Sequence, residues 1–102
     1  MIIVEGWVKL APGEIDRLHE KALWMMEQTR AEDGCLSYCF SRAMEEPDTL
    51  RIAERWQSQD ALDAHAASAH MAEFNAAMGG ATILGASLKS YEAEEKATLL
   101  GD

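Results

Sequence analysis

Two histidines in the second half of the chain have the residue type and the setting for acid–base chemistry. His65 and His70 lie five residues apart in the stretch ERWQSQDALDAHAASAHMAEF, residues 54–74. A neutral imidazole accepts a proton near neutral pH, because its unperturbed pKa is about 6.5. Beside a phenolic substrate, either histidine could therefore act as a general base. Histidines in small proteins are also often structural, so the elements around them decide between the two roles.

Both histidines have apolar neighbours at helical spacing. His65 follows Ala61 and Leu62 by four and three residues, which predicts that it shares their inward face. His70 precedes Phe74 by four residues and could edge the same pocket, although a histidine near a helix start is often exposed. Aromatic walls for this pocket are available from Tyr38, Trp56 and Phe74.

Two further polar residues are expected in apolar surroundings. Glu54 shares a strand face with Ile52 and Trp56, and an acid among such neighbours needs a partner or has a raised pKa. We expect a basic partner such as Arg42, with the orientation of a histidine as the alternative role. Asn75 lies on an apolar helix face, where an amide needs a partner or a ligand. The predicted substrate contacts are thus Tyr38, Glu54, Trp56, Phe74 and Asn75.

The two cysteines do not suggest a disulfide or a metal site. In GCLSYCFSR the alternating character predicts a strand, which would place Cys35 and Cys39 about 13 Å apart at ~3.3 Å per residue. That separation is too long for a disulfide. No second cysteine pair follows that could complete a zinc site.

Composition limits the class of protein. With 102 residues, 48% of them apolar, the chain is expected to form one domain over 1–102, with a polar tail at 92–102. The net charge of -9, from 18 acidic and 9 basic residues, argues against nucleic-acid binding. No apolar run reaches membrane-spanning length, and MIIVEGWVKL lacks the features of a secretory signal. We therefore expect a cytoplasmic location.

The spacing of apolar residues and breakers predicts the element order. Strands are expected over residues 2–10, 35–44, 50–57 and 82–94, with an amphipathic helix over 14–32. A second helix is broken in two, one piece capped by Ser58 and ending at His65, the other capped by Ser68 and ending near Met78. This order, βαββαβ, predicts an α+β ferredoxin-like fold with a split second helix.

Both faces of the predicted sheet carry apolar residues. In the first strand Val4 and Val8 alternate with Ile3 and Trp7, and the last strand places Ile83 opposite its other apolar residues. The predicted helices suffice to cover one face only. A second copy of the chain is the simplest cover for the other face, so we expect a homodimer.

The sequence resembles the antibiotic biosynthesis monooxygenase family, and within it the small bacterial quinol monooxygenases. The resemblance runs from residue 2 to about 91 and includes APGE after the first strand, EDGCLSY, and AERWQSQDALDAHAASAHMAEFNAAM. Its most specific part is E-x-W-x-S followed by H-x-x-S-x-H-M-x-x-F. The resemblance implies a dimeric α/β barrel with a pocket between sheet and helices in each subunit.

The resemblance also implies a chemistry. Members of this family insert oxygen into electron-rich quinols and anthrones without a metal, flavin or other cofactor, since the deprotonated substrate itself supplies the electrons. The implied partners are a small aromatic substrate and dioxygen, with His65 the favoured catalytic base and His70 the second choice.

Three alternatives come from other proteins of related fold. Haem degradation is disfavoured because Gly6, His65 and Asn75 stand where that branch has asparagine, tryptophan and histidine. An isomerase of a phosphorylated signalling sugar shares the two-histidine spacing, but few arginines are available for a phosphate. The remaining alternative is a dimeric barrel that binds an apolar ligand without catalysis.

Overall fold

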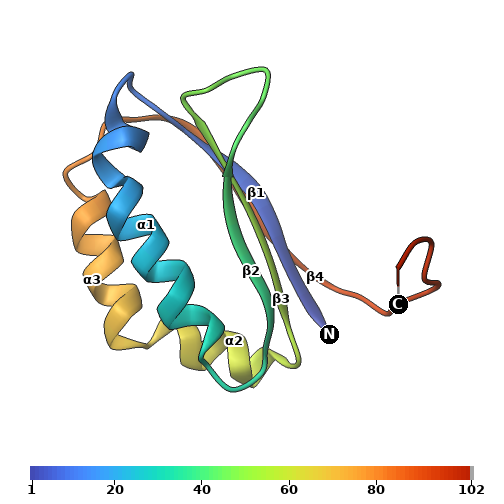
Figure 1. Ribbon diagram of the computed structural model, residues 1–102. Helices are drawn as coiled ribbons and strands as arrows, with labels where there is room; N and C mark the ends of the chain where they lie inside the picture. Colours follow the sequence, from blue (N-terminus) through green and yellow to red (C-terminus); the bar gives the residue numbers. More distant parts are fainter. Residues whose placement is uncertain (102) are drawn as a thin grey trace.

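The computed structural model describes residues 1–101 and confirms the predicted α+β order. Figure 1 shows a single sheet with all helices on one side of it. The elements are β1 (Ile2–Leu10), α1 (Glu14–Arg30), β2 (Cys35–Arg42), β3 (Thr49–Trp56), α2 (Gln59–Ala66), α3 (Ala69–Met78) and β4 (Ile83–Glu92). The predicted bounds differ from these by at most two residues, mainly at the ends of α1, β2 and β4.

The sheet is antiparallel throughout, with strand order β2-β3-β1-β4. This is the arrangement of the ferredoxin-like fold. Its register aligns four helix-facing residues in one row across the sheet, namely Tyr38, Glu54, Val4 and Ser90. At Gly6, in the next row, a β-carbon would collide with the carbonyl oxygen of Ser87, so glycine is required for β4 to pair closely with β1.

The core lies between the sheet and the helices. Its largest fully buried side chains are Trp56, Leu10, Met25 and Thr29. Trp56 is therefore a core residue. None of the helices in residues 1–101 is long and apolar enough to cross a membrane.

The break between α2 and α3 is made by Ser68. Its hydroxyl donates to the carbonyl oxygen of His65 at 2.7 Å and accepts from the backbone N–H of Met71 at 3.2 Å, so it stabilises the ends of both helices. In one continuous helix, residues five apart point about 140° away from each other. The break instead allows His65 and His70 to face the same way.

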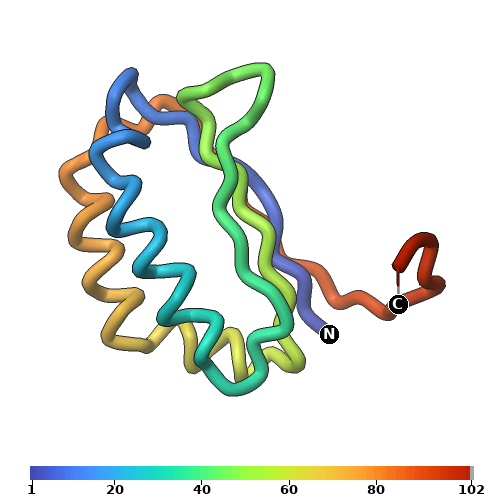
Figure 2. The backbone as a smooth tube through the Cα atoms, viewed as in Figure 1, coloured from blue at the N-terminus to red at the C-terminus, as the bar shows by residue number. Residues whose placement is uncertain are grey.

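The turn between α1 and β2 lies against the start of α2, at the lower end of the backbone in Figure 2. Gly34 has a φ of 82° in this turn, and its carbonyl oxygen accepts from the N–H of Gln57 at 2.8 Å. A β-carbon at Gly34 would also lie 2.6 Å from that of Ala61. Glycine thus satisfies both the left-handed backbone and the close approach.

Candidate active site

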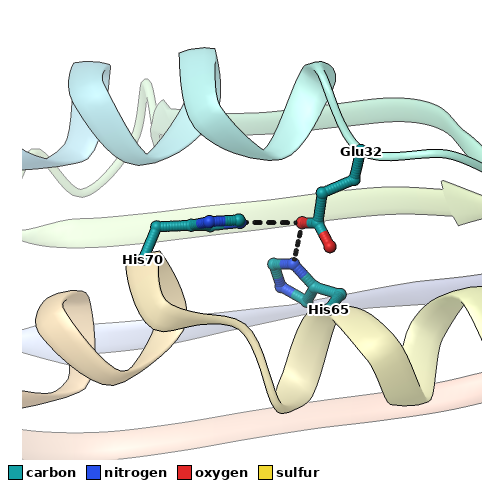
Figure 3. Close-up of side chains that lie close together, drawn as sticks. All are labelled: Glu32, His65 and His70. Atoms are coloured by element: carbon teal, nitrogen blue, oxygen red, sulfur yellow. Dashed lines mark hydrogen bonds and ion pairs between the residues drawn. The ribbon is translucent and has the colours of Figure 1, made fainter.

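The main feature of the site is a carboxylate that forms hydrogen bonds with two histidines. Figure 3 shows Glu32, from the turn after α1, between His65 of α2 and His70 of α3. Its Oε2 lies 2.6 Å from Nδ1 of His65 and 2.9 Å from Nε2 of His70. The His65 side chain is 5% exposed, and those of Glu32 and His70 are 15% and 16% exposed. His70 is therefore partly buried rather than merely exposed at a helix start.

The shared carboxylate determines which nitrogen of His65 is free. As an ionised acceptor, Glu32 favours the tautomer with the proton on Nδ1 of His65. The other nitrogen, Nε2, then carries a lone pair, since the hydrogen bond of the His65 ring within residues 1–101 is made by Nδ1. His65 also lines a cavity. The residue whose Nε2 can accept a proton is therefore part of the cavity wall.

The cavity lies between the sheet and the helix pair α2 and α3 and has a volume of about 400 Å³. This is within the range of pockets that hold small molecules. Its wall combines mainly apolar side chains with a few polar ones. The polar residues are Tyr38, Glu54, His65, Asn75, Lys89 and Ser90.

The predicted site residues divide into two groups. Five of them line the cavity: Tyr38, Glu54, His65, Phe74 and Asn75. Trp56 lies behind the wall, where its ring centre is 4.8 Å from that of His65. His70 reaches Glu32 instead of the cavity. Three of the five residues expected at the pocket border thus line the cavity, and Glu54 and Asn75 line it as well.

Glu54 has a different partner from the predicted one. Its Oε1 accepts from the indole N–H of Trp56 at 2.9 Å, whereas Arg42 pairs with Asp16 at 2.7 Å. Within one chain the prediction of an Arg42 partner was wrong, because Arg42 lies at the exposed end of β2, two residues beyond the buried part of the strand. The alternative, that Glu54 orients a histidine, was also wrong, because Glu32 makes both contacts.

Two groups on the cavity wall have shifted pKa values. Burial raises the pKa of the Glu54 carboxyl above its ordinary value, although the Trp56 hydrogen bond and His65 lower it. Burial, together with the negative charge of Glu54, also raises the pKa of the Tyr38 phenol. Tyr38 therefore keeps its proton at neutral pH and can donate a hydrogen bond to a ligand.

The buried carboxyl of Glu54 should make stability depend on pH. Because folding raises the pKa of the Glu54 carboxyl, the contribution of this group to stability is fully present below the ordinary pKa of 4.5. That contribution is lost as pH rises through the native pKa. Glu54→Gln removes the charge and retains an oxygen acceptor for Trp56. We expect the variant to gain thermal stability relative to the parent over the range in which pH rises above the ordinary value of 4.5. A stability difference that stays constant over this range, measured by circular dichroism, would contradict the assignment.

Sequence patterns alone did not identify Glu32 as a site residue. It follows an amphipathic helix among other charged residues, where a solvated role is the ordinary expectation. Glu32 is the first residue of EDGCLSY, a segment that carries the family resemblance, but the resemblance assigned no role to this residue. Its contacts with the two histidines depend on the Gly34 turn, which places it over the α2–α3 break.

The fold and the site define a ferredoxin-like α+β protein with a histidine–carboxylate cluster beside a cavity. The chain belongs to the antibiotic biosynthesis monooxygenase family, whose model matches residues 1–77. Among named relatives, "Putative monooxygenase YcnE" of Bacillus subtilis is 27% identical over 72% of this chain and 78% of its own length. "Putative monooxygenase Rv0793" of Mycobacterium tuberculosis is 40% identical over 54% of each chain.

Solved structures agree with this assignment. A structure described as a putative antibiotic biosynthesis monooxygenase from Deinococcus radiodurans has a TM-score of 0.88 and 26% identity, covering 99% of this chain and 100% of that one. The structure of Rv0793 has a TM-score of 0.83 and 27% identity, covering 95% and 98% of the two chains. The family and the ferredoxin-like α+β fold are thus confirmed, and a monooxygenase-like function is supported.

Proposed function

We propose that this protein oxidises a quinol- or anthrone-like dihydroxyaromatic with dioxygen, without a cofactor. The observation that carries the proposal is the placement of His65. Its Nδ1 is held by Glu32 at 2.6 Å while its ring lines the cavity of about 400 Å³. A base with one nitrogen fixed and the other free is suited to removing a phenolic proton.

In the proposed reaction, His65 Nε2 accepts the proton of a substrate hydroxyl, and the resulting phenolate is electron-rich enough to react with dioxygen. One oxygen atom forms a bond to carbon, and the other leaves as water. For a hydroquinone, the product is a hydroxyquinone, and the substrate supplies all four electrons that reduce dioxygen. No external reductant is needed, which is consistent with a protein that supplies only a base and a pocket.

The wall of the cavity suits a neutral aromatic substrate. Phe74 stacks on Phe40 with ring centres 5.4 Å apart, and Tyr38 meets Phe40 edge-on at 5.1 Å. Tyr38 and Asn75 supply hydrogen-bonding groups for substrate hydroxyls. Among the described residues that line the cavity, Lys89 is the one lysine and there is no arginine, so a phosphorylated sugar is less well served.

We further propose that the protein acts as a homodimer, in which the sheet face without helices is covered by a second copy. The outer face of β1 carries Ile3 and Trp7, and Tyr91 of β4 pairs with Ile3 on the same face. Sedimentation at micromolar concentration should therefore give a dimer. A stable, folded monomer under these conditions would rule out this arrangement.

The two free thiols, Cys35 and Cys39, fit a reducing compartment, and we propose the cytoplasm.

Oxygen uptake tests the proposal. The purified protein is assayed with a panel of hydroquinones and anthrones in buffer that contains a chelator and no flavin, against the rate without protein. We expect protein-dependent uptake with at least one substrate. If no member of the panel is consumed above the background rate, the isomerase and ligand-binding alternatives become preferable, and the cavity keeps only a binding role.

A further inference from the structure

The Glu32–His65–His70 cluster has a second chemical capacity besides holding a base. One ligand atom from each residue lies within 4.8 Å of the others, and all three are of the kinds that transition metals prefer. In a tetrahedral zinc site, ligand atoms are about 3.3 Å apart, given metal–ligand distances of about 2.0–2.1 Å. The two nitrogens already lie 2.6 and 2.9 Å from the carboxylate oxygen. Small movements of the side chains would therefore open a metal-sized space.

The elements allow such movements. His65 and His70 are held by α2 and α3, while Glu32 extends from the turn after α1. Rotation about the side-chain bonds of Glu32 can move the carboxylate outward while both helices stay in place. With three protein ligands, a fourth position would remain for water or another ligand, as in zinc sites that are not purely structural.

The charge around the cluster also favours a cation. Within residues 1–101, the ion pairs of Glu32 are with the two histidines, and neither lysine nor arginine neutralises it. The chain as a whole carries a net charge of -9. A divalent ion would relieve this local excess of negative charge.

We propose that Glu32, His65 and His70 form a binding site for a divalent transition-metal ion of the zinc class, and that the metal withdraws the base from the cavity. A metal on Nδ1 of His65 occupies the nitrogen that otherwise carries the proton. The proton of the neutral imidazole then resides on Nε2, where no lone pair remains to accept one from a substrate. The metal site stands independently, and only the loss of activity rests on the proposed function.

Calorimetric titration of Zn²⁺ into the chelator-treated full chain tests the site. We expect one ion per chain, and at least hundredfold weaker binding by His70→Ala and by Glu32→Gln, since loss of a ligand exceeds the 10–100-fold effect of losing an outer-shell partner. His19→Ala is the matched control, because His19 is exposed on α1 and lies outside the cluster. It should bind like the parent.

Two results would overturn the metal site: no binding by the parent, or equal binding by the parent and the folded cluster variants. If the variants fail to fold, nitrogen NMR of the parent decides. Zn²⁺ should shift the signals of His65 Nδ1 and His70 Nε2 and leave His19 unchanged, and unshifted cluster signals would also refute the site. Binding without inhibition of quinol oxidation would overturn the proposed switch alone. A protein that binds zinc and oxidises no quinol would instead contradict the proposed function.

Discussion

His65→Gln should lower the turnover of quinol oxidation by about a hundredfold to ten-thousandfold, the usual contribution of a positioned general base. Glutamine can still donate from its amide to Glu32, so the contact at 2.6 Å has a replacement, but the amide cannot accept the substrate proton. Steady-state oxygen uptake measures the effect, and circular dichroism checks the fold.

Glu32→Gln should cause a smaller loss, because it weakens the orientation of the imidazole without removing the base. His70→Gln, measured beside it, tests whether the second histidine contributes through the shared carboxylate. If His65→Gln oxidises substrate as fast as the parent while His70→Gln does not, the roles of the two histidines are exchanged. If both variants are fully active, neither is the base.

Trp56→Ala should destabilise the protein by about 3–5 kcal/mol, the usual range for truncation of a large buried aromatic side chain. Trp56 has 0% exposure and packs against His65, with ring centres 4.8 Å apart. Its loss also removes the indole N–H that Glu54 accepts at 2.9 Å, which leaves a buried carboxylate without its donor.

Urea unfolding followed by circular dichroism measures this effect. Trp56→Phe is the matched variant, because it retains most of the ring and removes the N–H. We expect it to be destabilised less than Trp56→Ala, by about 1–3 kcal/mol for the lost hydrogen bond. Unfolding midpoints for Trp56→Ala equal to those of the parent would show that neither packing nor the hydrogen bond to Glu54 matters for stability.

Local sequence patterns predicted the helices and strands well, because the residues that determine each of them are close together in the sequence. Alternating apolar residues marked β1 at its observed bounds, Ile2–Leu10, and the two serine caps marked the divided second helix. The inward placement of His65 followed from its three- and four-residue spacing to apolar neighbours. These features depend only on residues close in sequence.

The contacts of the site were harder to predict, because they join distant segments. Glu32 meets His65 and His70 across 33 and 38 residues, through a turn and a helix break that no periodicity describes. Glu54 was predicted to need a partner or a raised pKa, and it has both. Its partner, however, is not a basic group but the indole N–H of Trp56, two residues away on the same strand face.

Isotopic labelling of the product tests the central claim most directly. The parent protein is incubated with a hydroquinone under ¹⁸O₂, and the product is analysed by mass spectrometry. A monooxygenase reaction predicts one labelled oxygen atom in a hydroxyquinone, with the second atom released as water. A product that carries no label, formed as simple quinone with hydrogen peroxide, would contradict oxygen insertion even if dioxygen is consumed.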